Sequence, residues 1–266
     1  MSFTIFRKEI QKNYYLGLIP AAMIGFTILL AAVWPEFKSY APEMEEVMEA
    51  ELYQAMLSEG ALAAGIGSFE GFFGMELFTI LDFAFMALAV FLGVGVIARE
   101  VDKGTLDISL SYPISRYKLP LGKFAAINTY IFTIPILVSI PISLTAVFFG
   151  ENINHFALVL AFFARCCVFF ALSALSLLCA AIFLRPKLAY SSAGGVVVGS
   201  YILMGLGGLV DSLELLQNLS MFYYMDGTAI WASGNFPLDE LVIVLGVGVL
   251  ALVAALVIFQ HQELTY

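Results

Sequence analysis

Two charged residues stand inside long apolar stretches of the sequence, where a charge needs a physical reason. Asp82 follows the residues LFTIL, and Arg165 follows LVLAFFA. If these stretches cross a membrane, each charge costs about 2.5–3.5 kcal/mol at the bilayer centre even on the gentlest scale. Opposite signs at similar depth favour an ion pair between Asp82 and Arg165, or a polar cavity that they share. The alternative is that each side chain reaches the headgroup region alone by snorkelling.

Patterns for catalysis or metal binding are weak in the rest of the chain. Cys166, Cys167 and Cys179 share one apolar stretch with no carboxylate or histidine at ligand spacing, so we expect small buried hydrophobes and no metal site. Lys123 follows a glycine as in a phosphate-binding loop, but Tyr117 stands where that pattern requires glycine. Neither HExxH nor GxSxG occurs. We therefore expect no catalytic residues and no ATP hydrolysis by this chain itself.

A long polar interval rich in basic residues runs from 99 to 123 and carries five of the twelve Lys and Arg residues. These five are Arg99, Lys103, Arg116, Lys118 and Lys123. Leu106 and Leu110, four residues apart, would share one face of a short helix that Pro113 ends. The pattern predicts an amphipathic helix held between two spans as a docking element, or a re-entry loop lying on lipid headgroups.

Composition places the chain in a membrane. Of its 266 residues 61% are apolar and 12% are charged, and the mean hydropathy is +0.95, far from the values of a soluble domain. Apolar runs of around 20 residues can cross a hydrocarbon core as helices, and they lack the alternation of barrel strands. We therefore predict an all-α integral membrane protein with a single transmembrane domain over residues 1–266. Its six spans are predicted at 15–34, 77–98, 124–149, 156–184, 188–210 and 241–260.

Three segments outside the spans have patterns of their own. Residues 1–14 mix apolar and charged positions as an interfacial helix does. Residues 35–76 contain nine Glu, and an amphipathic helix is expected over 42–58 before a glycine-rich return. Residues 211–239 are unusually aromatic, so we expect an extracellular, partly helical segment at the outer interface, where such rings are favoured.

The distribution of charge predicts an orientation. Ten of the twelve basic residues fall before the first span, within 99–123 or in the turn at 185–187. By the positive-inside rule these segments and both termini are cytoplasmic, and 35–76 and 211–239 are outside. Fifteen of the 21 acidic residues fall on that outer side. Such acidity fits a well-solvated surface or, alternatively, attraction of cationic cargo.

Two sets of small residues predict close helix packing. Gly17, Ala21 and Gly25 recur every fourth residue in the first span, and Gly195 and Gly199 form a GxxxG pair in the fifth. Such faces serve contacts within one chain at least as often as contacts between chains.

One region also resembles a known family. Arg99 and Glu100 end the second span, and they are followed by GTLD at 104–107, PISR at 113–116 and Gly-Lys at 122–123. This order is similar to that in the permease subunits of ABC-2 type transporters, which the chain also resembles in span number and loop sizes. In that family the matching segment is a cytoplasmic coupling helix that enters a groove on a separate ATP-hydrolysing subunit. The resemblance assigns the ATPase contact to Gly104, Thr105, Leu106, Asp107, Leu110, Pro113 and Arg116.

The resemblance also implies a function. It implies a permease subunit of the cell membrane that pairs with a second permease copy, expected to be identical, and with separate ATPase subunits. ATP and Mg²⁺ would bind to the ATPase, with no cofactor in this chain and no nucleic acid as a partner. Family membership favours export of an amphipathic or hydrophobic substrate such as a peptide, lipid or drug.

Three other functions stay open from the sequence. An ion-coupled transporter or channel acting without an ATPase would use Asp82 and Arg165 as a relay, although the inverted repeat typical of such proteins is not evident. A membrane anchor for a cytoplasmic complex would need no passage. A permease of the copper or nitrous-oxide accessory type would belong to the same family.

Overall fold

The structure is built from helices. The computed structural model describes residues 3–48, 64–65, 67–102, 104, 115–209 and 214–262. Within these ranges no strand is present, and six helices are long and apolar enough to cross a membrane, which confirms the predicted all-α fold with six spans. They are α2 (Leu18–Met48), α5 (Phe69–Asp102), α7 (Lys118–Phe149), α8 (His155–Phe183), α9 (Pro186–Leu209) and α12 (Leu238–His261).

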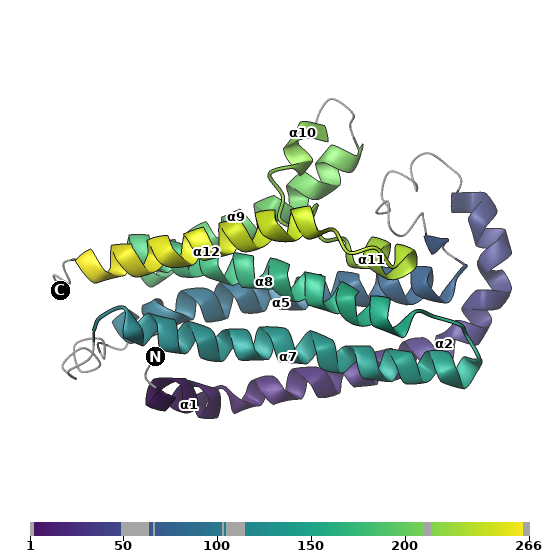
Figure 1. Cartoon of the computed structure of the whole chain (residues 1–266), viewed down its shortest axis with the longest axis horizontal. Helices are drawn as coiled ribbons and strands as arrows, with labels where there is room; N and C mark the ends of the chain where they lie inside the picture. Colours follow the sequence, from purple (N-terminus) through teal and green to yellow (C-terminus); the bar gives the residue numbers. More distant parts are fainter. Residues whose placement is uncertain are drawn as a thin grey trace.

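Shorter helical elements flank these long helices. They are α1 (Phe3–Lys12), the 3-10 turn η1 (Tyr14–Gly17), α10 (Glu214–Gln217) and α11 (Gly227–Ser233). α1 packs against α7, α10 against α9, and α11 against both α5 and α8. Figure 1 shows the long helices running along one axis, except that the last part of α2 turns away from it, and it shows the start of α1 and the end of α12 at the same end of the bundle. The end of α5 and the start of α7 lie at that end too.

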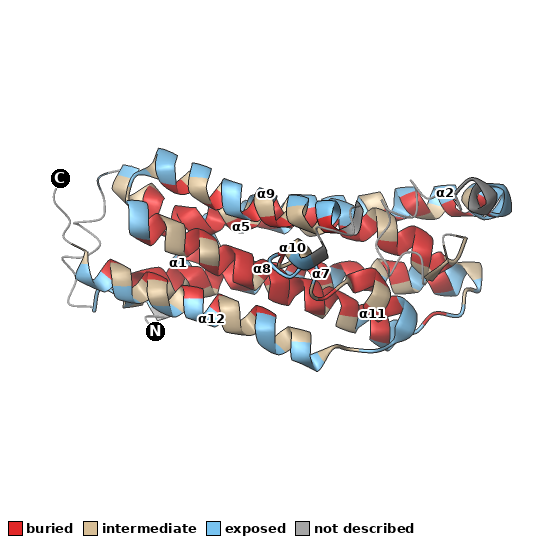
Figure 2. Ribbon diagram, turned by 90° about the horizontal axis from the view of Figure 1, so that it is seen from above, coloured by how far each residue is buried: buried red, intermediate tan, exposed pale blue. Residues whose placement is uncertain are grey.

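Helix α8 is the centre of the bundle. It packs against α5, α7, α9, α11 and α12. Figure 2 shows buried residues concentrated along α8 and α5, whereas α9 and α12 expose their outer faces. Many of the buried side chains of α8 are small, including Ala161, Ala164, Ala171 and Ala174. Small side chains let neighbouring helices approach closely, and that contact holds helices together in lipid.

Glycines on the neighbouring helices show how close this approach is. A Cβ added to Gly93 of α5 would lie 2.7 Å from the backbone oxygen of Ser173 in α8. One added to Gly248 of α12 would lie 2.7 Å from the ring of Phe170. Neither glycine belongs to the small-residue sets that the sequence singled out.

The first long helix extends beyond its predicted span. α2 continues through Pro35 and Pro42 to Met48, so no loop separates the span from the next helical segment, although Figure 1 shows the last part of α2 turned sharply away from the first. Residues 42–48 are the end of α2, and the rest of the helix predicted over 42–58 lies outside the described residues. A helix-interior proline removes one backbone hydrogen bond, and outside the membrane water can satisfy the freed carbonyl.

Tertiary contacts hold this extension in place. The Trp34 ring lies edge-on to Phe69 of α5, with 5.3 Å between ring centroids. Its Nε1 donates a hydrogen bond to Glu151 Oε1 at 3.2 Å, and the Lys38 Nζ lies 2.6 Å from the same oxygen. Glu151 follows Gly150, whose left-handed conformation (φ 71°) ends α7. The turn after α7 therefore anchors α2 past Pro35.

The second span also begins earlier than predicted. α5 starts at Phe69 and includes Gly71 and Gly74, which we had assigned to a flexible return. α11 packs directly on Gly74, where an added Cβ would lie 2.8 Å from Thr228 Cγ2. At 34 residues α5 is about 51 Å long at the helical rise, and Figure 1 shows it reaching past α9 at the end opposite the termini.

The aromatic segment before α12 differs from the prediction as well. It is partly helical, as expected, but Phe222 and Trp231 are almost fully buried, and only Tyr223 among these three is well exposed. The Phe222 ring lies edge-on to Tyr201 of α9, with 5.4 Å between centroids. The Phe222 and Trp231 rings therefore pack against the helices of the bundle, and Tyr223 stays exposed.

Substitution of Gly93 by alanine tests the close contact between α5 and α8. Gly93→Ala should lower the free energy of unfolding by about 1–3 kcal/mol, because the added methyl meets backbone atoms that cannot move aside. Gly246→Ala in α12 is the matched control, since a Cβ there meets nothing within 4 Å. The measurement is the temperature at which each purified variant loses its monodisperse peak in detergent. Equal shifts for the two variants would contradict the packing argument.

Candidate functional site

The two charged residues that the sequence placed inside spans lie in contact. Arg165 Nη2 of α8 is 3.5 Å from Asp82 Oδ2 of α5, and the two residues are 4% and 5% exposed. The pairing expected from their similar depth is therefore present, in preference to separate snorkelling. Because both residues are buried, neither charge is hydrated by water at the protein surface.

The ion pair is linked to the short helix α11 through an aromatic ring. The guanidinium carbon of Arg165 lies 5.7 Å from the centre of the Phe78 ring, a cation–π distance. A Cβ added to Gly227, the first residue of α11, would lie 2.9 Å from the same ring. The Phe78 ring therefore lies between the start of α11 and the Arg165 guanidinium.

Local sequence explains why α11 forms there. Asp226 caps its start by accepting hydrogen bonds from the backbone N–H groups of Thr228 (2.9 Å) and Ala229 (3.4 Å). Gly234 ends it in the left-handed conformation, φ 70°. Glu240 of α12 accepts a hydrogen bond at 3.0 Å from the N–H of Met225. A short helix far below the length that is stable alone is therefore held by both caps and by α12.

The predicted coupling segment is described only at its edges. Thr105, Leu106, Asp107, Leu110 and Pro113 lie outside the described residues. Gly104 follows α5 with φ 59°, and its N–H donates to the Val101 carbonyl at 3.1 Å, a glycine stop for the helix. Arg116 Nη1 donates a 3.4 Å hydrogen bond to the Gln262 carbonyl beyond α12.

The helix ends on either side of this segment are joined by an ion pair that the sequence did not predict. Lys123 Nζ of α7 is 2.7 Å from Glu100 Oε1 of α5. Lys123 stands out in the sequence as a basic residue after a glycine, and both residues as parts of a family motif, but nothing in their spacing of 23 residues shows that they meet. The available signal was their position, at the inner ends of two consecutive predicted spans.

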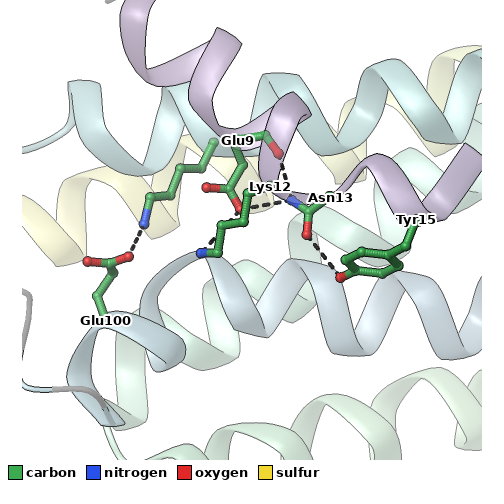
Figure 3. A network of polar contacts seen from close by, with 6 residues as sticks. Glu9, Lys12, Asn13, Tyr15 and Glu100 are labelled. Carbon is green, nitrogen blue, oxygen red and sulfur yellow. Dashed lines mark hydrogen bonds and ion pairs between the residues drawn. The ribbon is translucent and has the colours of Figure 1, made fainter.

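The N-terminal helix α1 is fixed to the same end of the bundle. The Asn13 side-chain amide donates to Glu9 Oε1 and to the Glu9 carbonyl, both at 2.9 Å, and Tyr15 donates to Asn13 Oδ1 at 3.0 Å. Figure 3 shows this network together with Lys12 and with Glu100 of α5. The Tyr130 hydroxyl of α7 donates to the Ile10 carbonyl at 2.9 Å. α1 is thus bound to the first half of α7. The charge distribution predicts that this half faces the cytoplasm.

The five small residues singled out for packing lie on open faces of the chain. Gly17, Ala21, Gly25 and Gly195 are exposed and Gly199 is half-buried. A Cβ added to any of the four glycines would meet nothing within 4 Å. These faces are therefore not the close helix contacts of this chain, and their use between chains stays a prediction.

The cysteines fill space between helices. Cys166 and Cys167 are buried in α8, and the Cys166 thiol points to the Phe132 carbonyl of α7 at 3.8 Å. Within the described ranges no three His, Cys, Asp or Glu residues gather as a metal site would require.

Taken together, the fold and site define a multi-pass membrane protein with a polar segment between its second and third spans. A family model described as ABC-2 family transporter protein matches residues 3–264. The chain therefore belongs to the ABC-2 transporter family, as the resemblance of residues 99–123 predicted. It is a membrane-spanning permease subunit of an ABC transporter, a class in which ATP is hydrolysed by a separate subunit. No curated protein matches the sequence significantly.

Neutralising the buried pair tests its coupling. Asp82→Asn or Arg165→Gln should each cost about 3–5 kcal/mol of stability, because each leaves the other charge buried and unpaired. The double variant should cost clearly less than the sum, with a coupling of at least about 1 kcal/mol. The measurement is thermal stability of all four proteins in detergent.

The exposed pair Lys38 and Glu151 is the matched control. Its own cycle, Lys38→Gln with Glu151→Gln, should show coupling below about 1 kcal/mol, because solvent screens an exposed pair. Additive losses at Asp82 and Arg165 would show that the two charges do not depend on each other.

Proposed function

We propose that this permease subunit exports an amphipathic or hydrophobic substrate, such as a peptide, lipid or drug, when a separate ATPase subunit hydrolyses ATP. The observation that carries the proposal is the family match over residues 3–264. The six apolar helices and the buried cores of α5 and α8 support it, because they form a bundle that a soluble ATPase can move only from the cytoplasmic end.

The contact with the ATPase is proposed to lie between α5 and α7. Leu106 and Leu110 would pack into the groove of the ATPase, with Asp107 beside them, and Gly104 and Arg116 at the ends of the segment. ATP and Mg²⁺ would bind to the ATPase, and closure of its subunits would displace this segment. The two helices that flank the segment would then carry the displacement into the membrane.

A second copy of the chain is proposed to complete the passage. The open faces around Gly17 at the end of η1, Ala21 and Gly25 in α2, and Gly195 and Gly199 in α9 support this role, because an added Cβ at any of these glycines meets nothing within 4 Å in the chain. We propose a homodimer in the cell membrane, with both termini and the segment at 99–123 in the cytoplasm, in accord with the positive-inside rule.

Two alternatives to this function use the same architecture. An ion-coupled transporter acting alone would need Asp82 and Arg165 to exchange protons or ions during transport. A permease of the copper or nitrous-oxide accessory type would keep the same architecture with another cargo. Both differ from the main proposal in a measurable way, the first in having no ATPase partner and the second in its cargo.

Charged substitutions at the proposed contact test the ATPase partnership. The tagged chain purified gently from its host should bring with it a soluble subunit carrying a Walker motif. Leu106→Glu with Leu110→Glu should abolish that association, because two charges would enter an apolar groove. The measurement is mass spectrometry of the co-purified proteins.

Leu215→Glu with Leu219→Glu is the control, since these leucines are also four apart and are 81% and 65% exposed on the predicted outer side. That variant should keep the partner. Purification of the unmodified chain alone would favour the ion-coupled alternative.

A further inference from the structure

The ion pair between Glu100 and Lys123 is unusual because Lys123 is buried and Glu100 is mostly shielded from solvent. The side chain of Lys123 is 8% exposed and that of Glu100 is 13% exposed. A lysine near a membrane surface can send its amine to water along its flexible stem, and buried lysines are rare unless paired. Lys123 instead donates a 2.7 Å charge-assisted hydrogen bond to Glu100 Oε1. Reduced solvent around the pair strengthens this attraction.

Neighbouring residues leave Glu100 facing α7. Arg99 folds back along its own helix, so that a Cβ added to Gly95 would lie 2.7 Å from Arg99 Nε. Consecutive residues of a helix point about 100° apart. The Arg-Glu pair at the end of α5 therefore sends its two charges in different directions, and only Glu100 crosses to the neighbouring helix.

The pair closes a long loop. Glu100 lies in the last turn of α5 and Lys123 in the second turn of α7, 23 residues apart in sequence. Joining two points of a chain removes conformational freedom from everything between them. The two helix ends that flank the proposed ATPase contact are thus held at a fixed separation. α7 is also bound to α1, through the hydrogen bond from Tyr130 to the Ile10 carbonyl.

We propose that Glu100 and Lys123 are positioning residues that make the ends of α5 and α7 move as one body when the ATPase displaces the segment between them. The proposal rests on the proposed function, because it needs an ATPase that acts on this segment. Without the ion pair, the same displacement would separate the two helix ends and be lost there. With it, the displacement travels along α5 to its outer part, where Gly74 and Phe78 contact α11.

The experiment measures that transmission without knowledge of the cargo. The chain is purified with its ATP-binding subunit and placed in lipid nanodiscs, and hydrogen–deuterium exchange is followed in peptides covering α11, with and without ATP and vanadate. ATP hydrolysis and retention of the ATPase subunit are measured on the same samples. The variants are Glu100→Gln, Lys123→Gln, Glu100→Asp, and the exchange of charges by Glu100→Lys with Lys123→Glu. The control is Lys38→Gln with Glu151→Gln, a more exposed pair that joins α2 to the turn after α7.

In the unmodified complex, nucleotide should change the exchange of α11. Glu100→Gln and Lys123→Gln should keep the ATPase subunit and its hydrolysis but lose most of the nucleotide-dependent change. Glu100→Asp should lose part of it, because the shorter side chain keeps the charge and not the contact. The charge exchange should restore the response, which a general loss of stability would not allow, and the control should leave it intact.

Several results would overturn the proposal. If α11 in the unmodified complex does not respond to nucleotide, or if the Gln variants respond as strongly as the unmodified chain, the pair has no role in transmission while the proposed function stands. If the Gln variants do not fold, the charge-exchange variant decides the question. If α11 in that variant does not respond to nucleotide, the pair has no role in transmission. If the unmodified chain carries no ATPase subunit, the proposed function fails, and this proposal fails with it.

Discussion

The structure depends on how closely helices can approach α8. Lipid tails are as apolar as the helix surfaces, so burial of apolar area does not draw helices together in a membrane, and close packing must do so. α8 meets this constraint with a series of alanines, and its neighbours meet it with Gly93 and Gly248 at the points of contact. Five helices can therefore surround one central helix. The lipid-facing helices α9 and α12 then need only an apolar outer surface.

Two ion pairs in this bundle join neighbouring helices, where apolar packing alone does not determine which helices are neighbours. Asp82 and Arg165 join α5 to α8 deep in the structure, and Glu100 and Lys123 join α5 to α7 near the other end. A buried pair adds little net stability over apolar residues of the same size, but removal of one partner is costly. Such pairs therefore specify which helices are neighbours more than they raise stability. α5 takes part in both pairs, so it connects the two ends of the molecule.

Much of this arrangement could be read from the sequence. The six spans follow from apolar runs of sufficient length, and the meeting of Asp82 and Arg165 follows from depths that can be counted along a helix. The helix extensions could not be predicted in the same way, because beyond the membrane hydropathy no longer marks a helix. α2 passes Pro35 because Trp34 and Glu151, far apart in sequence, come together.

A glycine can mark either a close helix contact or an open, flexible position, and the sequence alone does not distinguish the two. Gly74 had the pattern of a flexible connection and is a helical contact with Thr228, whereas the regular spacing of Gly17 and Gly25 marks an open face. Glu100 and Lys123 were each visible as polar residues at span ends, but their meeting depends on how α5 and α7 are set side by side. The role of each of these residues depends on contacts between helices, which residue spacing within one helix does not reveal.

The unequal helix lengths limit the bilayer that suits this protein. α9 and α12 have 24 residues each, or about 36 Å of helix, slightly more than a hydrocarbon core of about 30 Å. A thinner bilayer would be met by tilting of these two helices, at modest cost per ångström of mismatch. A thicker one would draw the level of Asp226 and Glu240 into hydrocarbon, where α11 and its polar cap cannot stay hydrated. Membrane thickness therefore acts on α11 from outside, through lipid composition alone.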